Sequence, residues 1–379
     1  MSVAVLAGLA IVAAALARPS SHSATAAGAT CSKGVQIGML APITGPASSI
    51  GSDQLHWAQF YVSNWNKAHK LKLKLVQGDT QLDPSKASTV AQSFASNKSI
   101  MGVIGPAGSD EVQATAPILK KAGLAFVSGS ATRVSLTGGQ WKGFFFRNVP
   151  NDGVQGPTDA NYMTSKLGVK SGDTVMVVDD QESYSTGLAD IVGAALKAKG
   201  VTVDRESISQ KDTDFSALVA KAGSAKIVFA PFQLSSQAQL LAQQLKAQGK
   251  SAVVFGSDGT FDSSKFSVAG SYVSFFAPDV TTLAANKSIV AAFNKQFPGG
   301  TSPFGAPNYV LAQMYAAAIT KACVDNKITR TELRLDLAKV KLPSSIFGVP
   351  VAFTAKGDVA GAKFYIFKIQ PDGSYKTVG

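Results

Sequence analysis

The chain has 379 residues, of which 45% are hydrophobic and 16% are charged. This length exceeds that of a typical domain and the composition is that of a globular protein with well-filled cores, so we expect two lobes. The formal net charge is +12, but the lysines are scattered along the chain. Nucleic-acid binders gather basic residues into patches, so we expect a solvated basic surface and no nucleic-acid partner.

The N-terminus carries an apolar run, residues 3–17, followed by a stretch to residue 30 rich in Ser, Thr and Ala. Such a run is short for a membrane span and typical of a secretory signal, and small residues around Ala26 and Ala29 suit cleavage. Residues 1–30 are therefore predicted to be an export signal and linker. The protein is expected to be extracytoplasmic, in the periplasm or on the outer face of the cell membrane.

Strand-like apolar runs then alternate with helical patterns, which predicts parallel sheets built from βαβ units and an α/β fold. A first series has strands at 35–40, 71–76, 101–104, 124–127 and 143–147 and helices at 53–67, 84–96 and 111–122. A second series has strands at 174–179, 202–208, 227–230 and 252–256 and helices at 157–166, 185–199, 215–222 and 236–247. Two such sheets in tandem imply a cleft between them, where pockets preferentially occur.

Two short loops follow predicted strands directly and are the main candidates for a binding site. They are Gly105–Ser109 and Ser128–Thr132, the second of which includes Ser130 and Ala131. Ligands bind outside the carboxyl ends of parallel strands, and Gly with hydroxyl residues brings N–H and O–H donors close to an anion. Neither loop contains Lys, Cys or His, so we predict a site that holds a small carboxylate without transforming it. The alternative is that both loops are merely tight turns.

An acidic residue lies in the loop that follows the last strand of the second series. Asp258 follows strand 252–256 and could pair with an ammonium group, although an Asx-turn in a Gly-rich loop is the alternative. Tyr184, Phe232 and Phe304 lie near strand ends or in loops, where each could contact an apolar ligand or belong to a core.

Patterns of enzyme and cofactor sites are missing from the sequence. It has no Gly-x-Ser-x-Gly elbow and no Gly-x-Gly-x-x-Gly after its first strand, and its histidines are His22, His56 and His69. A catalytic triad, a dinucleotide and a metal centre are therefore not predicted, and we expect neither a cofactor nor enzyme activity. A hydrolase with an unrecognised site is the less favoured alternative.

The chain has two cysteines, Cys31 and Cys323. Cys31 precedes the first strand, and Cys323 ends a helix predicted at 309–324 that would run toward the same sheet edge. A disulfide is possible in an oxidising compartment. Lipidation of Cys31 is an alternative, although Gly28 and Thr30 fit the usual lipidation motif poorly, and two free thiols are the third.

The order of several short motifs resembles that of the leucine/isoleucine/valine-type solute-binding proteins of ABC importers. The resemblance runs from about residue 35 to the C-terminus. It is carried by Ala41-Pro42-Ile43-Thr44-Gly45-Pro46, Gly78-Asp79-Thr80-Gln81-Leu82-Asp83-Pro84, Ile104-Gly105-Pro106, Gln155-Gly156-Pro157 and Tyr184-Ser185-Thr186-Gly187.

This resemblance implies the type I periplasmic-binding-protein fold, two Rossmann-like lobes joined by a three-segment hinge. Lobe 1 is then expected at 34–150 plus 279–360, and lobe 2 at 151–278 plus 361–379. The implied function is capture of a small amino acid, branched-chain or similar, and its delivery to an ABC permease by a protein expected to be monomeric. The alternatives are an aromatic or aliphatic carboxylate or amide without an α-amine, or a ligand-sensing partner of a signalling receptor.

The resemblance also implies roles for individual residues. Ser109 and Thr132 match the hydroxyls that hold the ligand carboxylate, while the Ser130 carbonyl and Asp258 match the acceptors of its ammonium group. Tyr184 and Phe232 match aromatics that cover the ligand, and Phe304 lies in the third contact segment. Two departures stand out: Ile50 replaces an aromatic residue, and Leu82 and Gly108 replace a disulfide-bonded cysteine pair.

Overall fold

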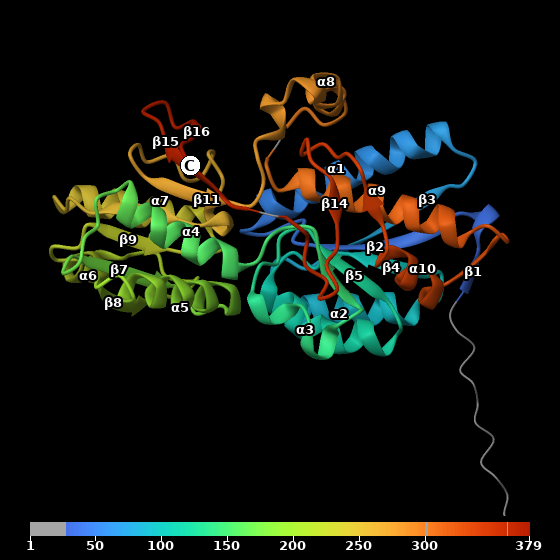
Figure 1. The fold of residues 1–379 in the computed structure, drawn as a ribbon, viewed down its shortest axis with the longest axis horizontal. Helices are drawn as coiled ribbons and strands as arrows, with labels where there is room; N and C mark the ends of the chain where they lie inside the picture. Colours follow the sequence, from blue (N-terminus) through green and yellow to red (C-terminus); the bar gives the residue numbers. More distant parts are fainter. Residues whose placement is uncertain (1–27, 300–301, 362) are drawn as a thin grey trace, which may run out of the picture.

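The computed structural model describes residues 28–299, 302–361 and 363–379. Most of the predicted export segment lies outside these ranges. Two large sheets lie side by side, each covered by helices on both faces (Figure 1). This arrangement confirms the predicted α/β fold with two lobes.

Lobe 1 contains a five-stranded parallel sheet in the order β3-β2-β4-β5-β6. Successive strand residues point to opposite faces, so each strand feeds two cores. In β2, Ile37 and Met39 pack with α1 and α9, while Leu40 packs with α2 and α3. The strands are β2 (Val35–Ala41), β3 (Leu73–Asp79), β4 (Ile100–Ile104), β5 (Ala125–Ser128) and β6 (Phe145–Arg147). The helices are α1 (Ser48–Ala68), α2 (Pro84–Ser96), α3 (Ser109–Lys121), α8 (Lys287–Gln296), α9 (Gly305–Ala322) and α10 (Arg330–Leu337).

Lobe 2 contains a seven-stranded sheet in the order β16-β15-β11-β10-β9-β7-β8. Strands β7 to β11 are parallel, and β15 and β16 add an antiparallel edge. Helices α4 and α5 cover one face, and α6 and α7 cover the other. The strands are β7 (Thr174–Asp179), β8 (Thr202–Ser207), β9 (Ile227–Ala230), β10 (Val253–Gly256), β11 (Tyr272–Phe275), β15 (Tyr365–Ile369) and β16 (Tyr375–Thr377). The helices are α4 (Asp152–Ser165), α5 (Ser183–Lys197), α6 (Ser216–Lys221) and α7 (Ser235–Ala247).

Short elements complete the described chain. Two small antiparallel pairs are β1 (Gly28–Thr30) with β12 (Lys327–Thr329) and β13 (Lys341–Leu342) with β14 (Val351–Ala352). The 3₁₀ helices are η1 (Cys31–Lys33), η2 (Val134–Leu136), η3 (Gly139–Trp141), η4 (Asp258–Thr260), η5 (Val280–Thr282) and η6 (Ala284–Asn286).

The chain passes between the lobes three times, after β6, after β11 and after β14. Each lobe is therefore assembled from separate stretches of sequence, and the long return through α9 and α10 completes lobe 1. Such multiple connections allow two lobes to move as rigid bodies about a hinge.

Several helices begin earlier than predicted: α1 begins at Ser48 and not at residue 53, α9 begins at Gly305 and not at residue 309, and two further differences concern α4 and α3. The helix predicted at 157–166 begins at Asp152, because the Asn151 side chain caps it by accepting a hydrogen bond from the Gly153 N–H at 2.9 Å. Pro157 therefore lies inside the helix and not at its first turn. The helix predicted at 111–122 begins at Ser109, which brings that hydroxyl to the helix N-terminus.

Cys31 and Cys323 form a disulfide in the structure, with Cα atoms 5.9 Å apart. Cys31 follows β1, and Cys323 caps the C-terminus of α9. Of the three alternatives for Cys31, the disulfide is thus the one that the structure contains. In the part of the chain that is described, no helix combines the length and the apolar character needed to span a bilayer.

Candidate binding site between the lobes

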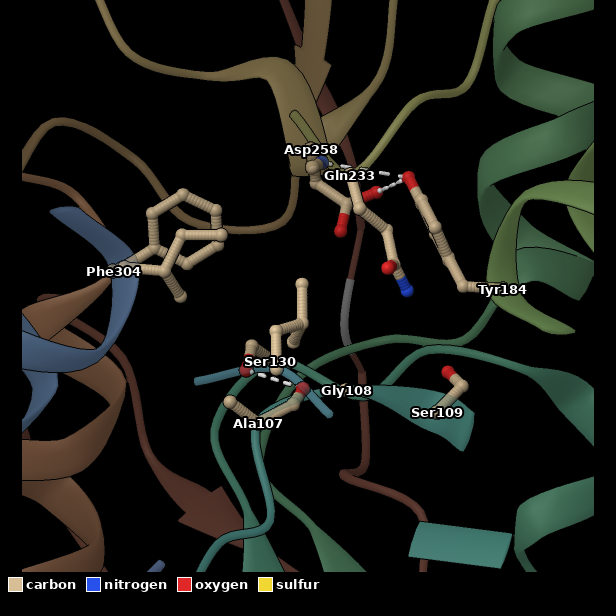
Figure 2. A pocket seen from close by; sticks show the side chains of 11 residues that line it. Ala107, Gly108, Ser109, Ser130, Tyr184, Gln233, Asp258 and Phe304 are labelled. Carbon is tan, nitrogen blue, oxygen red and sulfur yellow. Dashed lines mark hydrogen bonds between the residues drawn. The ribbon is translucent and has the colours of Figure 1, made fainter. Parts of the chain in front are cut away.

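A small cavity lies between the two lobes. Figure 2 shows loops of lobe 1 below it and loops of lobe 2 above it. It is lined from lobe 1 by Ile50, Leu82, Ala107, Gly108, Ser109, Ser130 and Phe304, and from lobe 2 by Tyr184, Gln233, Asp258 and Gly259. Five of the eight residues predicted to bind a ligand line this cavity: Ser109, Ser130, Tyr184, Asp258 and Phe304.

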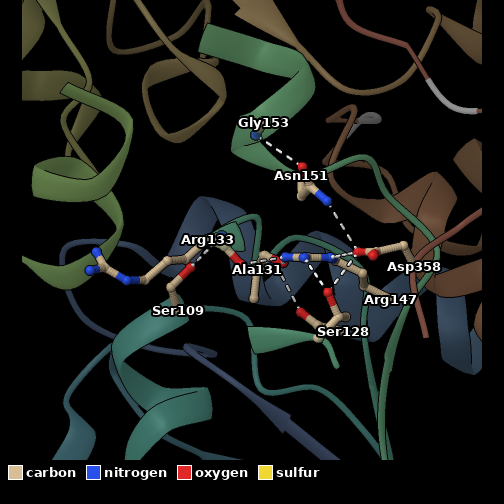
Figure 3. Close-up of polar contacts among 9 residues, drawn as sticks. Ser109, Ser128, Ala131, Arg133, Arg147, Asn151, Gly153 and Asp358 are labelled. Carbon is tan, nitrogen blue, oxygen red and sulfur yellow. Dashed lines mark hydrogen bonds and ion pairs between the residues drawn. The ribbon is translucent and has the colours of Figure 1, made fainter. Parts of the chain in front are cut away.

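The floor of the cavity includes the N-terminus of α3. Ser109 is the first helical residue, and its Oγ accepts a hydrogen bond from the Arg133 N–H at 3.3 Å, which leaves the hydroxyl proton free to donate (Figure 3). Free N–H groups at a helix N-terminus attract an anion. Glu111 lies in the same turn and accepts from the Gly108 N–H at 2.7 Å. Burial raises the pKa of Glu111 to about 8, so this carboxyl is neutral at pH 7 and does not repel an anion.

Hydroxyl groups fasten the two lobe 1 loops to each other. Ser130 Oγ donates to the Ala107 carbonyl and accepts from Gln54 Nε2, both at 2.8 Å. Ser128 Oγ donates to the Pro106 carbonyl at 2.6 Å. Gly105 has a φ of +105°, and a Cβ atom there would lie 2.0 Å from the Leu40 carbonyl oxygen, so the turn requires glycine. The floor is therefore preorganised by contacts within lobe 1.

Ala131 and Thr132 do not line the cavity. Both are buried, and Thr132 lies beside the buried carboxyl of Asp152. The cause is Arg147, whose fully buried guanidinium donates to the Ala131 carbonyl at 3.1 Å and pairs with Asp358 at 2.7 Å (Figure 3). Arg147 thereby holds the loop from behind. The sequence located this loop but did not indicate which of its side chains face the cleft.

The roof of the cavity includes the carboxyl of Asp258, which follows β10. One of its oxygens, Oδ1, accepts hydrogen bonds from the Tyr184 hydroxyl at 2.6 Å and from Gln155 Nε2 at 2.7 Å. Figure 2 shows the other oxygen directed into the cavity. Burial raises the pKa of Asp258 to about 6, while the bonds from Tyr184 and Gln155 act in the opposite direction. Asp258 is thus mainly ionised at pH 7 and offers a negative charge to the cavity.

Phe232 is placed in the lobe 2 core and not in the cavity. It is fully buried near Phe215, with ring centroids 6.5 Å apart. Alternation explains this, because Phe232 continues the side of β9 that carries Val228 and Ala230. The next residue, Gln233, faces the cavity instead. The two-residue period of the strand could have identified Gln233 from the sequence, because Gln233 points to the side opposite the buried side chains of Val228, Ala230 and Phe232.

The remaining wall is apolar. Ile50, Leu82 and Phe304 line it, and Phe304 meets Phe275 edge-on with centroids 5.1 Å apart. The site therefore places anion donors below, a carboxylate above and an apolar surface between them. Among the described residues no cluster of His, Cys, Asp and Glu could hold a metal ion.

A family model described as "Periplasmic binding protein" matches residues 34–374, so the chain belongs to the periplasmic binding protein family. The leucine-, isoleucine-, valine-, threonine- and alanine-binding protein of Pseudomonas aeruginosa is 25% identical over 356 residues, which cover 91% of this chain and 92% of that protein. These matches confirm the resemblance that the motifs indicated.

Two solved structures show the same fold. One is the substrate binding protein of a branched-chain amino acid transporter from Streptococcus pneumoniae in complex with isoleucine, with a TM-score of 0.80 and 23% identity over 91% of this chain and 99% of that one. The other is a leucine binding protein from Thermotoga maritima, with a TM-score of 0.81 and 20% identity over 91% of this chain and 98% of that one.

Proposed function

We propose that this protein is the extracytoplasmic solute-binding component of an ABC importer and captures a small amino acid between its lobes. The observation that carries the proposal is that the two walls of one cavity present groups of opposite electrostatic character. The α3 N-terminus with Ser109 forms the lower wall, and the Asp258 carboxylate forms the upper wall. An α-amino acid carries its carboxylate and its ammonium on one carbon, which suits these two walls.

In the proposed complex, the carboxylate accepts hydrogen bonds from Ser109 and from N–H groups of the lobe 1 loops. The ammonium donates to Asp258, which Tyr184 orients through its 2.6 Å hydrogen bond. An aliphatic side chain packs on Ile50 and Phe304. The curated relative from Pseudomonas aeruginosa, whose name includes leucine, isoleucine and valine, supports a ligand of this class.

Binding is proposed to act through closure of the lobes. The carboxylate contacts belong to lobe 1 and the ammonium contact belongs to lobe 2, so only the closed form makes both. A ligand then shifts the population toward closure by the free energy of the second set of contacts. The closed form is the one an ABC permease would recognise, and delivery would follow when the lobes open.

The proposal is tested by calorimetric titration after bound ligand has been removed by unfolding and refolding. Leucine, isoleucine, valine, threonine and alanine are compared with benzoate and 4-methylpentanoate, which lack an α-amine. We expect a dissociation constant in the micromolar range, about −8 kcal/mol, for at least one amino acid. Ser109→Ala should weaken that binding about tenfold or more, because the ligand carboxylate loses a buried donor. The control Ser96→Ala, at the exposed end of α2, should not change it.

Other results would contradict the proposal. Tight binding of benzoate with no binding of any amino acid would assign the cavity to carboxylates without an amine. Turnover of a bound compound would instead indicate an enzyme. Affinity unchanged by Ser109→Ala would show that the carboxylate lies elsewhere.

A further inference from the structure

A hydrogen bond joins buried side chains of the two lobes beside the ligand cavity. Gln233 of lobe 2 donates from its Nε2 to Oδ1 of Asp110 in lobe 1 at 3.1 Å. The two residues are 6% and 8% exposed, respectively. Gln233 also lines the cavity, and Figure 2 shows its side chain directed from lobe 2 toward the lobe 1 loop at Gly108. Because this hydrogen bond bridges the lobes, it exists only while they are closed.

Contacts within lobe 2 fix the position of Gln233. Its backbone N–H donates to Asp180 Oδ2, and its side-chain Oε1 accepts from Gln210 Nε2, both at 2.9 Å. Since the amide oxygen is engaged within lobe 2, the amide nitrogen of Gln233 is the atom that faces lobe 1. A donor that is already held in position loses little side-chain entropy when the lobes meet, so more of the hydrogen-bond free energy is left to favour closure.

The acceptor, Asp110, belongs to the part of lobe 1 that is proposed to bind the ligand carboxylate. It is the second residue of α3, directly after Ser109. Its other oxygen, Oδ2, is buried and has no hydrogen-bond partner among the described residues. A buried carboxyl that loses a donor incurs a desolvation cost that an exposed carboxyl does not. The closed form therefore depends on the donor that Gln233 supplies.

Other contacts across the cleft are more exposed to solvent. Lys265 Nζ of lobe 2 lies 3.3 Å from the Pro46 carbonyl and 3.4 Å from Ser49 Oγ, beyond the usual range for N–H···O bonds, and the lysine side chain is 37% exposed. The Arg133 guanidinium donates to the Ser183 carbonyl from a partly buried position. Water competes for such contacts, so the bond between the two buried side chains is the better determinant of closure.

We propose that Gln233 and Asp110 form a latch, a pair of positioning residues that holds the lobes closed over the ligand and so prolongs its residence in the cavity. The proposal rests on the proposed function in one respect, that the lobes close on a ligand bound between them. The ligand enters the open form, in which the latch is broken, so the latch leaves the association rate unchanged. It slows the opening that precedes release, so its loss raises the dissociation rate.

The test is a double-mutant cycle of Gln233→Ala, Asp110→Ala and the double variant, in which stopped-flow fluorescence measures association and dissociation of leucine, or of whichever amino acid binds. Each single variant should release the ligand about tenfold faster or more, because a hydrogen bond to a buried carboxyl is lost. The effect in the double variant should be clearly smaller than the product of the two single effects, because both substitutions remove the same bond. Asp110→Asn keeps an acceptor oxygen and should release the ligand more slowly than Asp110→Ala. Gln243→Ala, at an exposed position of α7 in the same lobe, is the matched control and should behave as the wild type.

Single effects that simply multiply in the double variant would overturn the latch, because the two residues would then act independently. If benzoate or 4-methylpentanoate binds and no amino acid does, the proposed ligand class fails, and the same cycle tests the latch on the compound that binds. If none of these compounds binds, small-angle scattering of the ligand-free protein decides. The radius of gyration should then be smaller in the wild type than in the double variant, and equal radii would overturn the latch.

Discussion

Replacement of Asp258 by Asn should weaken the binding of amino acids but not the binding of carboxylic acids that lack an amine. The substitution keeps the shape of the side chain and removes the negative charge that faces the cavity. Asp258 is 3% exposed, and Tyr184 and Gln155 already bind its Oδ1. Loss of one partner of a buried, hydrogen-bonded charge pair costs about 2–5 kcal/mol, which corresponds to about 30-fold to several thousand-fold in the dissociation constant.

The assay is calorimetric titration of the wild type and of Asp258→Asn with leucine and with 4-methylpentanoate, which is leucine without its amine. Leucine should bind at least about 30-fold more weakly to the variant. 4-Methylpentanoate should bind to the variant as well as to the wild type or better, because it leaves no buried charge unpaired in the variant. Asp262→Asn, four residues further on and outside the cavity, is the control. Equal losses for both ligands would refute an ammonium contact at Asp258.

Three further predictions concern residues behind the site. Arg147→Met should destabilise the protein by about 3–5 kcal/mol in chemical unfolding, because it leaves the Asp358 carboxylate unpaired and frees the loop at Ala131; a loss below 1 kcal/mol would contradict this. Glu111 has a folded pKa of about 8 and an unfolded value of about 4.3, so its neutral form stabilises the fold at low pH and this contribution declines as pH rises toward 8. Glu111→Gln should therefore flatten the fall of the melting temperature between pH 5 and pH 8, and an unchanged slope would exclude this role. Cys31→Ser should lower the free energy of unfolding by up to about 5 kcal/mol, since the disulfide to Cys323 closes a loop with a sequence separation of 292. Adding a reductant should lower the melting temperature of the wild type and leave that of the variant unchanged.

Much of the fold could be predicted from sequence because its signals are local. Strand and helix periods, together with the turn residues between them, gave the alternating order of elements in both lobes. The loop Gly105–Ser109 could be recognised because it follows a buried strand, and a parallel sheet places such loops at its ligand-binding edge. Elements without this regular order, such as α8, α10 and the antiparallel edge of β15 and β16, were not among the predicted ones.

The sequence alone therefore determined which loops line the cleft and which donor and acceptor groups those loops carry, because these features depend on residues that are close together along the chain. The tertiary structure decided which side chains reach the cavity. Thr132 is withdrawn because Arg147 and Asp358, far apart in sequence, hold its loop from behind. Likewise Asp110 and Gln233 belong to different lobes, and only the packing of one lobe on the other brings the Gln233 amide within 3.1 Å of the Asp110 carboxyl.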